Sequence, residues 1–262
     1  MRATPFGIGG SNLFSMFRNF FTHVGRYSMM LTGGFTRPEN GRLYWRELMA
    51  QCNDIGIRSL PIVLIISVFL GMVLTVQTSY QLLSPLIPRH VIAGVVRDST
   101  ILELSPTVVS IVLAGVVGSK IASELGNMRV SEQIDALEIM GINTKAYLVL
   151  PKVLAAVSMI PLLIVISIAV SIGGGYLAGT MSGILTSEQF ERGLMQKFVP
   201  FNVWFALIKS FVFAFLISTI PAYFGYHVQG GALEIGRAST TSVIVTCILI
   251  LFADYGLSVL LL

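Results

Sequence analysis

Five long apolar stretches constrain the fold of this chain more than any other feature of its sequence. They cover residues 59–82, 99–119, 153–180, 199–226 and 238–261. An α-helix rises about 1.5 Å per residue, so about 20 apolar residues cross the roughly 30 Å hydrocarbon core of a bilayer. Four stretches are long enough without help, whereas the second carries Glu103 and Pro106 near its start and gives the weakest signal. The pattern predicts an all-α integral membrane protein, a helical bundle with five transmembrane helices.

The overall composition also indicates a membrane protein. Of the 262 residues, 54% are hydrophobic and only 11% are charged, and the mean hydropathy is +0.81. A water-soluble domain does not need so many apolar residues to fill its core. Basic residues do not cluster with interleaved aromatic ones, so we expect no nucleic-acid partner. The cysteines and histidines lack the spacing of a disulfide or a metal site, so we expect no metal and no cofactor in this chain.

The amino-terminal part, residues 1–58, has a different pattern. Apolar residues recur there at helical spacing, but Arg18 and Arg26 interrupt them. Because an uninterrupted apolar run is needed to cross a bilayer, we expect an amphipathic helix that lies in the membrane plane. A signal peptide is the alternative, which the internal arginine and the lack of a small-x-small cleavage site disfavour. Turn residues at 32–41 and a second helix at about 43–57 should connect the in-plane helix to the first span.

A charged hairpin joins the second and third apolar stretches. It contains a predicted helix at about 127–141, which Gly126 and Gly141 bracket. Its apolar side chains fall close to one helical stripe, formed by Met128, Val130, Ile134 and Leu137. Its charged side chains lie on other faces, namely Arg129, Glu132, Asp135 and Glu138. Such a helix, held by two spans, can push on a soluble partner; alternatively, it is a solvated helix that only rests on lipid headgroups.

The distribution of lysine and arginine predicts the orientation of the spans, because cytoplasmic loops carry an excess of both. Twelve of these residues fall on one side: Arg2, Arg18, Arg26, Arg37, Arg42, Arg46, Arg58, Lys120, Arg129, Lys145, Lys152 and Arg237. Four fall on the other side: Arg89, Arg97, Arg192 and Lys197. We therefore expect the amino terminus and the hairpin in the cytoplasm and the carboxyl terminus outside.

A series of motifs in and before the hairpin resembles the MlaE/YrbE family. The motifs are E-L-x-P, L-A-G-x-x-G-S and S-E-L-G-x-M-x-x-x-E-Q-x-x-A-L-x-x-M, on Glu103, Leu104, Pro106, Leu113 to Gly115, Gly118, Ser119, Ser123 to Gly126, Met128, Glu132, Gln133, Ala136, Leu137 and Met140. The family commonly has other residues at the positions of Leu102, Ser105 and Val116. The resemblance covers roughly residues 40–260.

The resemblance implies a permease subunit of an ABC transporter that moves phospholipids between bacterial membranes. It implies a separate cytoplasmic ATPase that uses ATP, a periplasmic MCE-domain protein, a homodimer and a place in the bacterial inner membrane. Residues 59–262 would form the five-span permease domain, with 127–141 as its coupling helix. The residues expected to contact the ATPase are Met128, Arg129, Glu132, Gln133, Ile134, Asp135, Leu137 and Glu138. The chain's own GVVGSK at 115–120 lacks the spacing of a phosphate-binding loop, so we expect no ATPase site in it.

Three ionisable residues lie inside the apolar stretches: Glu103, Lys209 and Asp254. Each costs about 2.5 to 3.5 kcal/mol at the centre of a bilayer, so each should face protein or water. Opposite charge makes Glu103 and Lys209 the expected pair, which would line a cavity for a polar headgroup. In the resembling family the matching acidic residue and lysine lie at the substrate cavity. Alternatively, they form a structural ion pair or reach separately to the nearest interface, because Glu103 is near the end of its span and Lys209 is nearer the middle.

Other functions remain open from the residues alone. A membrane scaffold without transport activity would have no lipid cavity and would be indifferent to Lys209. An intramembrane enzyme is disfavoured, because Asp254 lacks a second intramembrane aspartate and the chain lacks a G-x-S-x-G turn. Small residues at 173–175 and Gly179 predict close helix packing in the third stretch, with contact to a passing substrate as the alternative.

Overall fold

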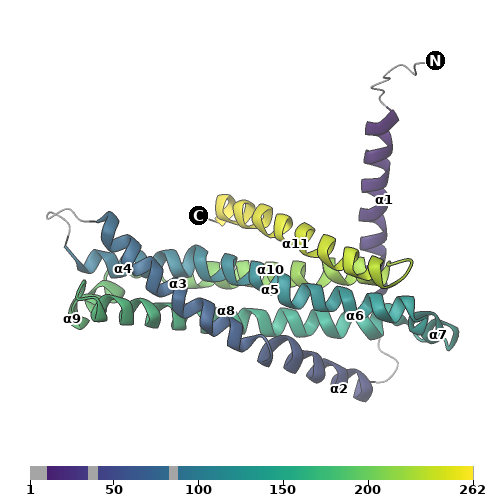
Figure 1. Cartoon of the computed structure of the whole chain (residues 1–262), viewed down its shortest axis with the longest axis horizontal. Coiled ribbons are helices and arrows are strands. Elements are labelled where there is room, and N and C mark those ends of the chain that lie inside the picture. Colours follow the sequence, from purple (N-terminus) through teal and green to yellow (C-terminus); the bar gives the residue numbers. More distant parts are fainter. Residues whose placement is uncertain (1–10, 35–40, 83–87, 262) are drawn as a thin grey trace.

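The structure, a computed structural model, describes residues 11–34, 41–82 and 88–261, and these ranges contain helices and no strand. Five helical stretches are long and apolar enough to cross a membrane: Tyr44–Gln81, His90–Val130, Lys145–Met181, Phe201–Tyr226 and Ala232–Leu261. They run along the long axis of the molecule (Figure 1). The predicted all-α fold with five spans is therefore confirmed. The predicted turn at 32–41 lies mostly outside the described ranges.

Short π-helical turns join several of the α-helices into longer spans. The α-helices are α1 (Ser11–Gly34), α2 (Gly41–Cys52), α3 (Leu60–Gln81), α4 (His90–Ser99), α5 (Val109–Leu113), α6 (Ser119–Val130), α7 (Gln133–Ile139), α8 (Leu150–Met181), α9 (Ser187–Met195), α10 (Phe201–Tyr226) and α11 (Ala232–Leu261). The π-helical turns are η1 (Asn53–Ile57), η2 (Thr100–Val108), η3 (Ala114–Gly118) and η4 (Lys145–Val149). Such turns occur frequently at functional sites, and η2 contains Glu103.

The amino-terminal region meets the bundle in two ways. Helix α1 stands across the long axis of the other helices (Figure 1), as expected of a helix in the plane of a membrane that the others cross. It contacts the bundle through buried Met30 and through a hydrogen bond of 2.7 Å from Tyr27 Oη to Thr219 Oγ1. Helix α2 continues through η1 into α3, which confirms that the connecting helix leads directly into the first span. The predicted boundary at residue 58 therefore falls inside one continuous helical stretch.

The second span begins earlier than the apolar pattern predicts. The expected start was residue 99, whereas the helical stretch begins at His90. Arg97 does not end it, because its guanidinium pairs with Asp98 at 2.8 Å and donates to the Leu194 carbonyl at 2.5 Å. Glu103 therefore lies about 20 Å along the helix from its start, at a rise of about 1.5 Å per residue. The alternative in which Glu103 and Lys209 reach separately to the nearest interfaces is therefore wrong, because the two side chains are in contact.

The hairpin helix predicted at 127–141 is two helices. Helix α6 continues from the second span to Val130, and α7 begins after Glu132, whose backbone has a left-handed φ of 59°. Gly126 does not start a helix but lies inside α6, where an added Cβ would come within 3.2 Å of the Ile235 side chain. Gly141, with a φ of +82°, follows the end of α7. We call the end of the bundle that holds α7 the hairpin end; α4 and α9 lie at the opposite end (Figure 1).

Helices α3 and α8 cross in direct backbone contact. A Cβ on Gly174 of α8 would lie 3.1 Å from the carbonyl carbon of Val68 and closer still to its oxygen. A Cβ on Gly175 would lie 2.6 Å from the Thr75 hydroxyl. Small residues let helix backbones approach this closely in membranes. The predicted packing role of the glycines in the third span is confirmed at these two positions.

Two neighbouring glycines of α8 offer a matched test of this contact. Gly174→Ala should destabilise the protein by about 2 kcal/mol or more, because the added methyl group meets the α3 backbone. Gly173→Ala should leave stability unchanged or raise it by up to about 1 kcal/mol, because nothing lies within 4 Å of its added Cβ. Thermal unfolding of both variants in detergent measures the difference. Equal midpoints would contradict the assigned contact.

Candidate functional site

The three intramembrane ionisable residues meet in one cluster. Lys209 of α10 places its Nζ 2.7 Å from Glu103 Oε2 and 2.6 Å from Asp254 Oδ1. The same ammonium donates to the Leu102 carbonyl at 3.2 Å and lies 4.7 Å from the centre of the Phe205 ring. The cluster therefore joins the second, fourth and fifth spans. It contains the expected pair of Glu103 with Lys209 and adds Asp254.

The role of Asp254 was missed by reasoning from the sequence. Its carboxylate also accepts a hydrogen bond of 3.3 Å from Thr107 Oγ1, in the same η2 turn that carries Glu103. The only signal in the sequence was that one lysine and two acidic residues occur inside apolar stretches. Which of them meet depends on how α10 and α11 pack, and the apolar pattern does not specify that. Asp254 belongs to the site as the second carboxylate of Lys209.

Exposure separates the two carboxylates into different roles. The side chain of Lys209 has 0% relative exposure and that of Asp254 has 10%, whereas that of Glu103 has 53%. A buried ammonium needs an opposite charge within contact distance, and Asp254 supplies it inside the bundle. Glu103 keeps half of its surface open and can reach a further polar group. The pair of Lys209 and Asp254 is therefore enclosed by the bundle, whereas the Glu103 carboxylate remains accessible.

The backbone around Glu103 is irregular. The η2 turn includes Pro106, which has no N–H to donate and cannot continue an ordinary α-helical hydrogen-bond ladder. The buried hydroxyls of Thr100 and Ser105 have no hydrogen-bond partner within the described part of the chain. Buried polar groups are nearly always paired, so these two mark η2 as a stretch with unused hydrogen-bonding capacity. This polar backbone segment lies directly beside the exposed carboxylate.

The hairpin presents a different surface from the one predicted. Ile134 is fully buried, and Met128 and Leu137 pack against the same core, so these three hold the hairpin on the bundle. The apolar stripe therefore faces the protein's own core, and contact of these three residues with a partner stays a prediction. Of the polar residues expected there, Arg129 and Asp135 are half-buried and three are exposed: Glu132, Gln133 and Glu138.

Two exposed apolar side chains on the hairpin were missed. Ile139 has 87% relative exposure and Met140 has 66%. They follow the stripe at the end of α7, just before Gly141 turns the chain. Large apolar side chains exposed beside charged ones are typical of protein contact surfaces. With Glu132 and Gln133, they form what we call the hairpin surface.

Hydrogen bonds connect the hairpin to the helix that carries Lys209. The Tyr226 hydroxyl, at the end of α10, donates to Glu138 Oε1 at 2.8 Å, and Thr144 Oγ1 donates to the same oxygen at 3.0 Å. The hydrogen bond from Tyr226 is the largest cause of a lowered pKa at Glu138, so this carboxylate stays ionised. Tyr226 and Lys209 are separated by about 25 Å of one helix. Glu138 of α7 is therefore hydrogen-bonded directly to the end of α10.

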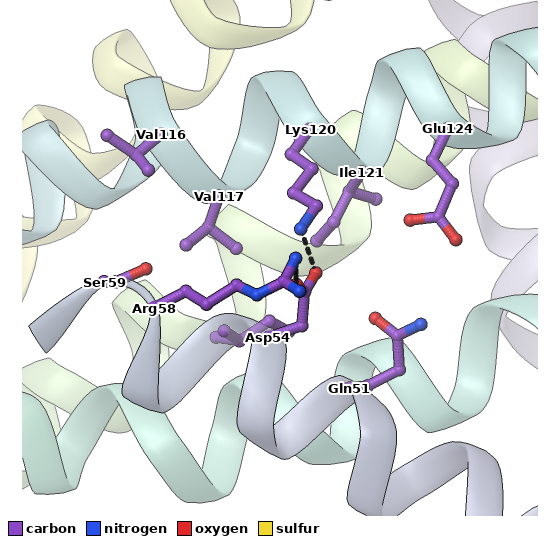
Figure 2. Close-up of a pocket in the computed structure, with 10 residues that line it drawn as sticks. Gln51, Asp54, Arg58, Ser59, Val116, Val117, Lys120, Ile121 and Glu124 are labelled. Carbon is purple, nitrogen blue, oxygen red and sulfur yellow. Dashed lines mark hydrogen bonds and ion pairs between the residues drawn. The ribbon is translucent and has the colours of Figure 1, made fainter.

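A small pocket lined by both charged and apolar side chains lies between the first and second spans (Figure 2). It has a volume of about 110 Å³ and is bounded by η1 on one side and by η3 and α6 on the other. Arg58 and Lys120 converge on Asp54 within it, Arg58 at 2.8 Å. Glu124, further along α6, pairs with buried Lys152 of α8 at 2.7 Å. These ion pairs connect the start of the first span to the helix that leads into the hairpin.

Comparisons with known proteins give one consistent picture. The chain matches the family model described as Permease MlaE over residues 48–260. It is 38% identical over 232 residues to the "Probable ABC transporter permease protein" of Rickettsia bellii, covering 88% of this chain and 89% of that protein. It is 30% identical over 242 residues, 92% of each chain, to the "Intermembrane phospholipid transport system permease protein MlaE" of Haemophilus influenzae. It is 34% identical over 222 residues to the chloroplastic "Protein TRIGALACTOSYLDIACYLGLYCEROL 1" of Arabidopsis thaliana, covering 83% of this chain and 62% of that protein.

The division of roles within the charged cluster can be tested by a double-mutant cycle. Lys209→Met should destabilise the protein by about 3 kcal/mol or more, because it leaves the buried Asp254 carboxylate without its cation. The double variant Lys209→Met/Asp254→Asn should recover part of this loss, since no buried charge remains unpaired. Thermal unfolding in detergent gives all the terms of the cycle. Strictly additive losses would contradict a direct interaction between the two side chains.

Proposed function

Because the chain belongs to the MlaE permease family and is a multi-pass membrane permease of the ABC type, we propose a substrate for it. We propose that it moves phospholipids between bacterial membranes. A separate ATPase supplies the energy from ATP. The observation that carries the proposal is the half-exposed Glu103 carboxylate beside the buried pair of Lys209 and Asp254. The name of the Haemophilus influenzae relative, which specifies phospholipid transport, supports the choice of substrate.

The exposed carboxylate of Glu103 is evidence for the proposal that two copies of the chain form a polar cavity. A carboxylate facing lipid tails near the middle of a span would cost about 2.5 to 3.5 kcal/mol. Its surroundings must therefore be polar when the protein is in the membrane. A second copy placed against this face would enclose a cavity with one cluster from each protomer. A phospholipid headgroup, which carries both charges and hydrogen-bonding oxygens, is suited to that cavity.

The hairpin surface is the proposed binding site of the ATPase, through which ATP hydrolysis would be coupled to the cavity. Ile139 and Met140 are exposed on α7, while Ile134 fixes the same helix to the core. A partner that pulls or pushes α7 would move the end of α10 through the hydrogen bond of Glu138 with Tyr226. Lys209 lies on that helix, so ATP hydrolysis and the cavity would be connected by one rigid element. A change between two arrangements of the cavity is the motion that lipid transfer needs.

The orientation follows from the same assignment. The hairpin end would face the cytoplasm of the bacterial inner membrane, where the ATPase finds ATP, and the amino terminus would lie on the same side. The excess of lysine and arginine toward that end supports this orientation. The end formed by α4 and α9 would face the periplasm and an MCE-domain protein that accepts or delivers lipid. The permease would contribute no ATPase site of its own.

Transport of lipid by a Glu103→Ala variant tests the proposal. We expect transfer of fluorescent phospholipid from proteoliposomes, with the ATPase and MCE-domain protein present, to fall about tenfold, which corresponds to about 1.4 kcal/mol of lost interaction. Stability should change little, because Glu103 is half exposed. Glu47→Ala, which removes a carboxylate of α2 outside the cluster, is the control and should transport normally. Full transport by Glu103→Ala would favour the alternative, a membrane scaffold without transport activity.

Co-purification with the ATPase tests the coupling role. Met140→Asp and Ile139→Asp should abolish recovery of the ATPase with the permease while the permease remains folded, because both side chains are exposed. Met195→Asp makes the same change at an exposed methionine of α9 and should retain the ATPase. Ile134→Asp would be uninformative, since it places a charge in the core. Recovery of the ATPase with both hairpin variants would exclude this surface as its binding site.

A further inference from the structure

A second polar pocket lies at the hairpin end, away from the Lys209 cluster. It has a volume of about 370 Å³ and is bounded by α1, the end of α10 and the start of α11. Its polar lining includes His23, Arg26, Tyr223, His227 and Arg237, together with one carboxylate, Glu234. Tyr223 is separated from Lys209 by about 21 Å of α10, so this pocket is not part of the proposed transport cavity.

The charges of this pocket favour an anion. Arg26 forms no ion pair with any residue in the described ranges, whereas Arg237 pairs with Glu234 at 2.7 Å. The pKa of His227 is lowered, first by burial and then by the positive charges of Arg26, Lys145 and Arg129. These three cations act on His227, whose side chain lines the pocket. Glu234, which also lines the pocket, provides the counter-charge of Arg237, so a bound anion would supply the counter-charge of Arg26.

The hydrogen-bonding groups favour an acceptor with several oxygens. His227 donates from Nδ1 to the Tyr223 carbonyl at 2.9 Å, which leaves its Nε2 without a partner in the described part of the chain. The Tyr223 hydroxyl and His23 Nδ1 share a hydrogen bond of 2.7 Å. The guanidinium of Arg26 adds a planar fork of N–H donors, a geometry that matches phosphate oxygens. Donors from two helices thus border one opening.

The position of the pocket, at the level of a membrane surface, indicates a lipid as the source of such an anion. Helix α1 exposes Phe21, Val24 and Met29 and stands across the bundle, which places its apolar side chains at a membrane surface. Basic pockets at that level bind lipid headgroups. We propose that this pocket binds the phosphate group of an anionic phospholipid in the leaflet at the hairpin end. This lipid would anchor α1 against α10 and α11, and it would not be the transported molecule.

Photocrosslinking at the pocket tests this proposal in the full chain. A photoreactive amino acid replaces Gln229, which lines the pocket, and the protein is placed in vesicles with radiolabelled phosphatidylglycerol or phosphatidylcholine. We expect crosslinking to phosphatidylglycerol to exceed that to phosphatidylcholine. Arg26→Gln with Arg237→Gln should reduce it roughly tenfold or more, because the two changes remove the guanidinium donors that line the pocket.

Matched arginines outside the pocket provide the control. Arg18→Gln with Arg192→Gln removes one charge from α1 and one from an ion-paired arginine of α9, and it should leave crosslinking unchanged. Equal crosslinking to both lipids, or equal loss in the two double variants, would overturn the proposal. Competition by millimolar inorganic phosphate would assign the pocket to a soluble phosphate and would overturn the lipid as its occupant. None of these outcomes depends on lipid transfer, so they are independent of the proposed transport function.

Discussion

The site depends on the neutralisation of one buried ammonium. Lys209 has no exposed surface, and a charge in that position is tolerated only with an opposite charge in contact. Asp254 meets this requirement from α11, and Glu103 adds a second carboxylate from η2. Three spans are thereby held at one level of the bundle. The cost of burying Lys209 explains both the position of Asp254 and the freedom of Glu103 to face outward.

The fold was largely predictable because hydropathy reports the environment of each residue directly. Five spans and the connection of α2 into the first of them follow from apolar runs and helical spacing. The start of the second span was not predictable, because Arg97 is accommodated by carbonyl groups of a segment about a hundred residues later. Of the two partners of Lys209, Glu103 was predicted and Asp254 was not, for the same reason. Side chains that are satisfied by distant residues leave no local pattern in a sequence.

The hairpin shows a related limit. Helical periodicity grouped Met128, Ile134 and Leu137, which do pack against one core although Met128 lies in α6 and the other two in α7, but it could not say what they contact. In the structure the protein's own core covers it, and the exposed apolar residues are Ile139 and Met140 at the end of α7. The break at Glu132 was also hidden, because a left-handed residue other than glycine is rare and depends on its tertiary setting. Helical periodicity therefore predicts which side chains lie together, but not whether they face the protein's own core or its surface.

The backbone contact between α3 and α8 has a mechanical consequence. Because Gly174 and Gly175 leave no space for side chains between these helices, neither can rotate about its axis or slide past the other without first separating from it. Serine hydroxyls at 67 and 167 hold the same crossing with a hydrogen bond of 2.7 Å. The first and third spans therefore behave as a single stiff frame. Any change of shape that keeps this contact therefore moves the first and third spans together.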